Sequence, residues 1–334
     1  MGKIRNYFAS ANTCNGFINL FNNINMESNS FLYIIKGGSG TGKSTLMKKI
    51  GNHFSKMGNS VEYFFCSSDS SSLDGVRVAD YNIAIVDGTA PHITNDSLPQ
   101  IRDKIINIGE YISQDIFNHK ERIESILVKK SKIYKAIYQR LKIAGDLYQL
   151  NNIILNEPKS LEVTKKTNEI IALLSLPNKN SAGKTRELFL NILNFNNSNF
   201  EEKNGYRYIL SFNGTQKFNE KVLDKVSKKI IDLGYSVINF KNILNPNGIS
   251  AIEIAEENIL IKANNIESNK SVLKNNRLIS DYLNNAKSNL KSAFNLHKKL
   301  ERFYIESTDF NGINLLTENL IKDIEKRIVN MQKK

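Results

Sequence analysis

The sequence predicts an α/β fold in which a parallel β-sheet, built around a phosphate-binding loop, occurs twice and is followed each time by a long helical segment. Three observations predict it: a glycine-rich motif between an apolar segment and an amphipathic helix, a repeat of that region, and long stretches of helical periodicity. With 334 residues, the chain can form two domains that each bury a core. We expect these domains at residues 1–181 and 182–334, because the helical pattern breaks near residues 177–182.

The glycine-rich motif fits the pattern G-x-x-x-x-G-K-[ST] of P-loop NTPases at every fixed position. Its glycines let backbone N–H groups surround the phosphates, while Lys43 reaches the β- and γ-phosphate oxygens and Ser44 offers its hydroxyl to Mg²⁺. The motif therefore predicts a nucleoside triphosphate site of the P-loop type. The residues expected to bind the nucleotide are Gly37, Gly38, Ser39, Gly40, Thr41, Gly42, Lys43, Ser44 and Thr45.

The segments around the motif have the periodicity of a β-α-β unit. Residues 31–36 form a short apolar segment typical of a buried parallel strand, and residues 43–57 have helical spacing that ends before Gly58. Residues 61–66 and 82–86 are expected to be the next strands. From residue 101 to 150, apolar residues recur every three or four positions, which predicts helix throughout.

An acidic residue follows the strand expected at residues 82–86. Asp87 resembles the Walker B aspartate that holds Mg²⁺, since catalytic groups gather at the carboxyl ends of strands in open α/β sheets. The alternative is an aspartate that caps a turn. No Glu follows Asp87, so fast hydrolysis is not indicated. His92 could order a water or sense the γ-phosphate, although a lone loop histidine is more often structural.

The polar segment 66–75 is predicted to be a loop after the second strand. Its carboxylates, Asp69 and Asp74, would suit the orientation of an acceptor hydroxyl, as the acid does in kinase sites. A turn rich in Ser and Asp, with helix-capping roles, explains the same residues. We therefore include Lys43, Asp87, Asp69, Asp74 and His92 as candidate catalytic residues, with Ser44 and Asp87 as metal ligands.

The chain contains an internal repeat. Residues 37–88 align without a gap on residues 213–264, and residues 2–8 align on residues 183–189. The second copy lacks the phosphate ligands, because the counterparts of Gly42, Lys43 and Ser44 are Phe218, Asn219 and Glu220. We expect one competent site, in the first half. The second half either only packs against it or supplies a basic residue, for which Arg207 and Lys217 are the candidates.

Composition limits the partners. The net charge of +13 is spread along the chain, so a nucleic acid is possible as a partner but is not favoured. Two cysteines are too few for a disulfide framework, and no apolar run is long enough to span a membrane, which together predict a cytoplasmic protein. The Asn-Lys-x-Asp pattern typical of guanine recognition does not occur, which favours ATP over GTP.

Three segments together carry a family resemblance: Gly-Gly-Ser-Gly-Thr-Gly-Lys-Ser-Thr-Leu-Met-Lys-Lys-Ile, Phe-Phe-Cys-Ser-Ser-Asp with Ser-Leu-Asp-Gly-Val, and Ala-Ile-Val-Asp-Gly-Thr-Ala-Pro-His. They resemble a poorly characterised family of bacterial tandem P-loop ATPases with a nucleotide-kinase-like fold. The resemblance implies ATP binding and names no acceptor. We therefore expect an ATP- and Mg²⁺-binding protein that hydrolyses ATP slowly or transfers phosphate to a small molecule. The alternative is an ATP-dependent switch that binds a protein or nucleic acid.

Overall fold

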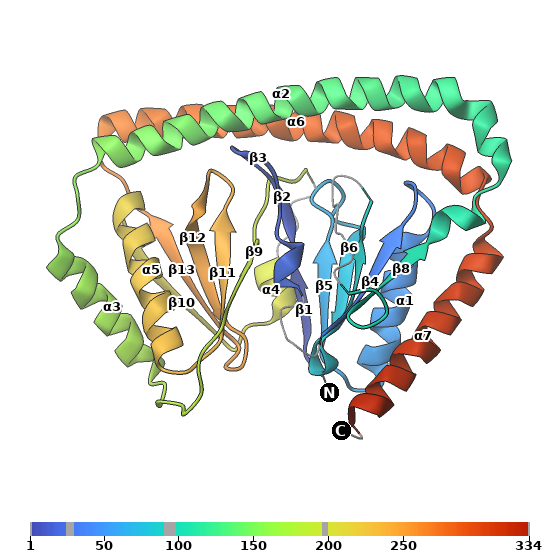
Figure 1. The fold of residues 1–334 in the computed structure, drawn as a ribbon. Helices are drawn as coiled ribbons and strands as arrows, with labels where there is room; N and C mark the ends of the chain where they lie inside the picture. Colours follow the sequence, from blue (N-terminus) through green and yellow to red (C-terminus); the bar gives the residue numbers. More distant parts are fainter. Residues whose placement is uncertain (1, 25–29, 90–97, 196–199, 333–334) are drawn as a thin grey trace.

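The structure is a computed structural model that describes residues 2–24, 30–89, 98–195 and 200–332. Two β-sheets stand side by side beneath a pair of long helices, and further helices cover the outer side of each sheet (Figure 1). The strands are β1 (Ile4–Tyr7), β2 (Ser10–Thr13), β3 (Gly16–Asn19), β4 (Phe31–Lys36), β5 (Val61–Phe65), β6 (Leu73–Val78), β7 (Ile83–Asp87), β8 (Asp103–Asn107), β9 (Thr185–Leu188), β10 (Tyr208–Gly214), β11 (Val237–Asn242), β12 (Asn245–Ile254) and β13 (Ile259–Asn265). The α-helices are α1 (Lys43–Lys56), α2 (Lys120–Ile154), α3 (Ser160–Leu174), α4 (Phe200–Asn204), α5 (Gln216–Asp232), α6 (Lys270–Glu306) and α7 (Phe310–Gln332).

The first sheet has six strands in the order β1-β5-β6-β7-β4-β8. The expected strands and the helix α1 are present, and β4 pairs in parallel with both β7 and β8. The expectation of a parallel sheet was wrong, because β6 runs antiparallel to β5 and β7. Only residues 66–72 join β5 to β6, and such a short connection returns the chain antiparallel, whereas a parallel neighbour needs a longer crossover.

The second sheet has five strands in the order β10-β13-β12-β11-β9. Its parallel pairs are β9 with β11 and β10 with β13, and β12 is antiparallel to both of its neighbours. Strand for strand, this order and these directions match those of β4-β7-β6-β5-β1 in the first sheet. Both sheets are therefore mixed, and the fold is α/β with two similar sheets.

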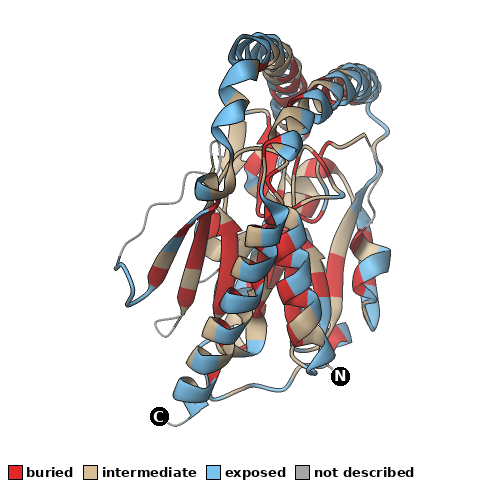
Figure 2. Cartoon of the chain, turned by 90° about the vertical axis from the view of Figure 1, so that its right-hand side faces the viewer, coloured by how far each residue is buried: buried red, intermediate tan, exposed pale blue. Residues whose placement is uncertain are grey.

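The layers follow from which faces are apolar. Helices α1 and α7 bury their apolar stripes against the outer face of the first sheet, and α5 and α3 cover the second sheet in the same way. Figure 2, viewed from the α7 side, shows this pattern: the strands behind the helices are buried while the outward faces of the helices are exposed. The inner faces meet in one shared core, which includes Phe64 from β5 and Phe240 from β11.

Helix α2 and helix α6 run alongside each other across the top of both sheets (Figure 1). The expectation of helix from residue 101 was wrong up to residue 119, since β8 and two 3-10 turns, Ile108–Tyr111 and Gln114–His119, precede α2. In β8, Ile106 is buried and its neighbour Ile105 is exposed, as in a strand with one face covered. Pairing with β4 therefore overrides the helical spacing. Within the described residues, no helix is both long and apolar enough to cross a membrane.

The two halves meet at β1 and β9, and their contacts are reciprocal. Phe8 and Phe189 exchange backbone hydrogen bonds of 3.0 and 2.9 Å. Arg5 of the first half contacts Glu253 of the second, and Arg186 of the second half contacts Glu62 of the first.

Candidate functional site

The glycine-rich loop, residues 37–44, connects β4 to the start of α1. Gly40 and Gly42 have φ angles of +79° and +86°, which a residue with a side chain rarely adopts. Gly42 is the N-cap of α1, no side chain caps this end, and the first turn contains no acid. The loop therefore presents backbone N–H groups and the positive end of a helix dipole, an arrangement that suits an anion.

Lys43 lies within this loop and is only 9 % exposed. Its ammonium donates hydrogen bonds to the carbonyl oxygens of Gly37 and Gly38, at 2.7 and 2.6 Å. The same nitrogen lies 3.5 Å from the Asp87 carboxylate. These contacts hold a positive charge at the mouth of the loop in a position where phosphate oxygens could replace the carbonyls.

Asp87 ends β7 and lies opposite Ile35 of β4 in the sheet register. One of its oxygens accepts a hydrogen bond of 2.8 Å from the backbone N–H of Thr89, and the other faces Lys43. Thr89 in turn donates its hydroxyl to the carbonyl of Gly37. Asp87 thus caps the turn and also faces the glycine-rich loop.

The Ser44 hydroxyl accepts a hydrogen bond of 2.9 Å from the backbone N–H of Leu73, which ties α1 to β6. Among the described residues, no group of three or more His, Cys, Asp or Glu side chains could hold a metal ion. Ser44 and Asp87 could supply two ligands for Mg²⁺, and the phosphates and water would complete the shell, as Mg²⁺ favours. The residues present therefore fit a metal that arrives with a nucleotide.

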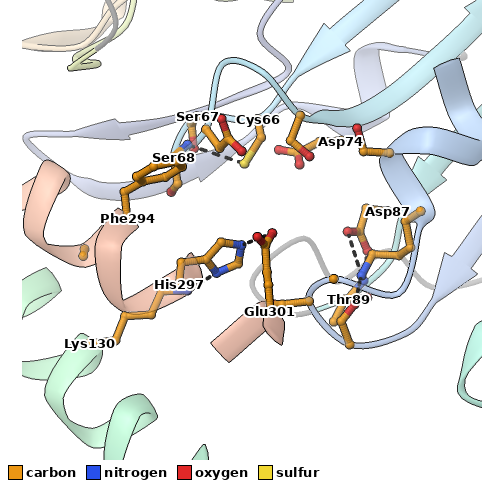
Figure 3. A pocket seen from close by; sticks show the side chains of 18 of the residues that line it. Cys66, Ser67, Ser68, Asp74, Asp87, Thr89, Lys130, Phe294, His297 and Glu301 are labelled. Atoms are coloured by element: carbon orange, nitrogen blue, oxygen red, sulfur yellow. Dashed lines mark hydrogen bonds and ion pairs between the residues drawn. The ribbon is translucent and has the colours of Figure 1, made fainter. Parts of the chain in front are cut away.

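A cavity of about 570 Å³ opens beside the loop. Its walls come from the glycine-rich loop, from the segment that follows β5, from the β2–β3 hairpin, and from α2 and α6. Figure 3 shows Asp74, Asp87 and Glu301 approaching it from three different elements. A cavity of this size falls within the range of small-molecule sites.

The two acids expected to orient an acceptor lie on the cavity wall, but their surroundings differ. One Asp69 oxygen accepts hydrogen bonds from the backbone and hydroxyl of Ser71, as in an ordinary turn, and the other lies 3.7 Å from Lys298. The loop expected over residues 66–75 ends earlier, because β6 begins at Leu73; Asp74 therefore lies in a strand, where it is buried beside Cys66. Burial and the Asp74 carboxylate raise the pKa of the Cys66 thiol, so this thiol stays protonated at neutral pH.

Helix α6 brings residues to the cavity that the sequence did not indicate. Glu301 lies 3.3 Å from the Nε2 atom of His297 and 2.8 Å from the Lys298 ammonium. Burial alone would raise the pKa of Glu301, but its contacts with His297 and Lys298 lower it to about 2. The Nδ1 atom of His297 lies 3.1 Å from the ammonium of Lys130 on α2 (Figure 3).

The contact between α6 and the glycine-rich loop is close. A methyl group on Gly40 would lie 2.7 Å from the backbone oxygen of Glu301, and one on Gly38 would lie 2.6 Å from the ring of Tyr304. Both glycines therefore allow the close approach of α6, and Gly40 is also required by the conformation of the loop. Neither Arg207 nor Lys217 lines the described part of the cavity, and Lys217 pairs with Glu157. His92 lies outside the described residues.

Helix α5 begins after β10 of the second sheet, as α1 begins after β4 of the first sheet. There Asn219 donates hydrogen bonds of 3.0 Å to the carbonyl oxygens of Gly214 and Asn264. Glu220 accepts a hydrogen bond from the Tyr148 hydroxyl, and the Phe218 ring approaches Gly214. The chain's own side chains thus make the contacts near this helix end, and a carboxylate is among them.

Comparison with protein families finds a similarity over part of the chain. A protein-family model described as Nephrocystin 3, N-terminal, matches residues 12–86, from β2 to the last residue before Asp87. No curated protein and no solved structure matches the chain. Over residues 12–86, which include the glycine-rich loop, the chain is therefore similar to that family.

Proposed function

We propose that this chain is an ATP-binding P-loop NTPase with one competent site, formed by the glycine-rich loop and Asp87. The observation that carries the proposal is the distance of 3.5 Å between the Lys43 ammonium and the Asp87 carboxylate. Lys43 follows the loop after β4, and Asp87 ends β7, the parallel neighbour of β4. In such a site Lys43 binds phosphate oxygens, and Ser44 and Asp87 hold Mg²⁺. The bound Mg²⁺ and triphosphate would supply the chemistry of phosphoryl transfer or slow hydrolysis.

The proposal includes an internal duplication. The two sheets share strand order and pairing directions, and Phe8 pairs with Phe189, the residue that the sequence aligns with it. The second copy has Asn219 and Glu220 in place of Lys43 and Ser44, so it serves as a partner for the first copy and not as a second site.

One observation favours a second candidate function, an ATP-dependent switch. Helix α6 contacts the glycine-rich loop near Glu301 and also runs along α2 over both sheets. A nucleotide that displaces α6 from the loop would move the surface formed by α2 and α6, which extends across both sheets. A protein or nucleic acid could bind this surface. A cytoplasmic protein could have either function.

Calorimetric titration with ATP and Mg²⁺ tests the proposal. We expect one site per chain, lost in Lys43→Ala and kept in Lys56→Ala, an exposed lysine of the same helix. Two equivalent sites, or unchanged binding in Lys43→Ala, would contradict it. ATP consumption with and without a panel of small acceptors then separates the two functions, since a switch would show no acceptor-dependent turnover.

A further inference from the structure

The cavity extends well beyond the glycine-rich loop. At its far end it is lined by the β2–β3 hairpin and by facing segments of α2 and α6. Four aromatic rings contribute to this wall, which we call the aromatic compartment: Phe17, Tyr134, Tyr138 and Phe294. Aromatic side chains at this density suit a flat ring, because such rings stack or pack edge to face.

A buried donor in the aromatic compartment has no hydrogen-bond partner among the described residues. Asn12 is 2 % exposed, and its side-chain oxygen accepts a hydrogen bond of 2.8 Å from the Tyr138 hydroxyl. In this arrangement the amide nitrogen of Asn12 is the atom left over, and it bonds to no described atom. A buried donor left unpaired is costly, so the arrangement indicates a ligand atom that accepts its hydrogen bond.

A lysine ammonium also borders the compartment. Lys130 lines the cavity, and its ammonium contacts the Nδ1 atom of His297 at 3.1 Å. It forms no ion pair with any described carboxylate. Burial lowers the pKa of Lys130, and the Glu301 carboxylate, which is too distant for an ion pair, offsets this only in part. An anionic ligand group at this ammonium would stabilise the charged form.

We propose that the aromatic compartment binds a second ligand, an aromatic anion. Its flat heteroaromatic ring would accept a hydrogen bond from the Asn12 amide, and its phosphate or carboxylate would pair with Lys130. This inference rests on the proposed function in one respect: ATP occupies the loop end of the cavity, so the second ligand lies beside it as the acceptor or as a regulator.

Four probes separate the parts of this ligand. Uridine 5′-monophosphate carries a ring and a phosphate, orotate carries a ring and a carboxylate, uridine lacks the anion, and ribose 5-phosphate lacks the ring. Calorimetry on the full chain, without ATP, should show binding of uridine 5′-monophosphate or orotate at least tenfold tighter than that of uridine and of ribose 5-phosphate. Whichever of these two probes binds more tightly shows whether the compartment favours a phosphate or a carboxylate. Equal affinities for all four probes would overturn the proposal.

Variants locate the binding. Lys130→Met should weaken the affinity for the anionic probe at least tenfold and leave the affinity for uridine unchanged. Lys129 is an exposed neighbour, and Lys129→Met should change neither affinity. Asn12→Asp keeps an acceptor for Tyr138 but removes the donor, so it should weaken every probe that carries the ring. If Asn12→Asp does not fold, the Lys130→Met result alone decides.

A crossed comparison distinguishes this proposal from the proposed function. Lys43→Ala should abolish ATP binding and leave binding of the aromatic anion unchanged. Lys130→Met should leave ATP binding unchanged and weaken binding of the aromatic anion at least tenfold. Loss of the anion in Lys43→Ala would mean that the probe binds the glycine-rich loop, and it would overturn the inference. Displacement of the anion by a non-hydrolysable ATP analogue would also overturn it, because the compartment would then hold the base of ATP.

Discussion

Phe8 and Phe189 donate a backbone hydrogen bond to each other, at 3.0 and 2.9 Å, and the sequence aligns these two residues as counterparts. The ion pairs on either side, Arg5 with Glu253 and Arg186 with Glu62, each join one half to the other. The junction is therefore held by one backbone pair and by an ion pair in each direction.

The first prediction concerns Glu62, which is buried between Arg186 and Arg77. Burial alone would raise the pKa of Glu62, but the two arginines lower it to about 2. A lowered folded pKa contributes stability above the unfolded value, about 4.5, and that contribution is lost as pH falls toward 2. At 1.36 kcal/mol per pKa unit, the difference in unfolding free energy between the wild type and Glu62→Gln should shrink by roughly 3 kcal/mol over this range.

Urea unfolding followed by circular dichroism at several pH values measures this difference. Glu253→Gln provides the control, because burial raises the pKa of Glu253 and its contribution changes with pH in the opposite sense. A constant difference for Glu62→Gln would show that Arg186 and Arg77 do not hold this carboxylate ionised.

The second prediction concerns Asp87. Asp87→Asn keeps an oxygen for the backbone N–H of Thr89 but removes the charge that would hold Mg²⁺ beside Lys43. We expect an unchanged melting temperature without ligand and loss of most Mg²⁺-dependent turnover. Melting curves and a turnover assay measure the two effects. Turnover within about threefold of the wild type, well under 1 kcal/mol of barrier, would show that Asp87 is not the metal ligand.

The third prediction concerns Gly40, whose positive φ angle and contact with Glu301 both exclude a side chain. Gly40→Ala should weaken ATP binding at least tenfold and lower the melting temperature. Gly16→Ala is the matched control, since Gly16 also has a positive φ angle but no neighbour within 4 Å of an added methyl group. Similar melting temperatures for the two variants would mean that the approach of α6 contributes nothing beyond the strain of the loop.

The fourth prediction concerns α7. Leu320 is buried against the first sheet, whereas Leu315 on the same helix is 59 % exposed. Leu320→Ala should cost about 2–5 kcal/mol of unfolding free energy, the range for deleting a buried leucine side chain, and Leu315→Ala less than about 0.5 kcal/mol. Equal costs in chemical denaturation would mean that α7 does not pack on the sheet in solution.

The sequence predicted the parts of the fold whose signals are local. The glycine-rich motif, the strand before it and the helix after it depend on neighbouring residues, and the structure has them within one or two residues of the expected bounds. The sequence did not predict β6 or β8, because these segments become strands by pairing with residues distant in the sequence. Glu301 and His297 were missed for the same reason: more than 250 residues separate them from the glycine-rich loop, and helical spacing gave no sign of which turn of α6 would reach it.

The place of α7 has a consequence for how the chain acquires its structure during synthesis. Helix α7 completes the hydrophobic core around β4 and α1, although more than 250 residues separate it from these elements in the chain. Until α7 has been synthesised, the nascent first half exposes the apolar surface that Ile313, Leu320 and Ile324 will cover. The first half therefore cannot complete its core before α7 has emerged, and a nascent chain stalled before α7 should depend on chaperones to avoid aggregation.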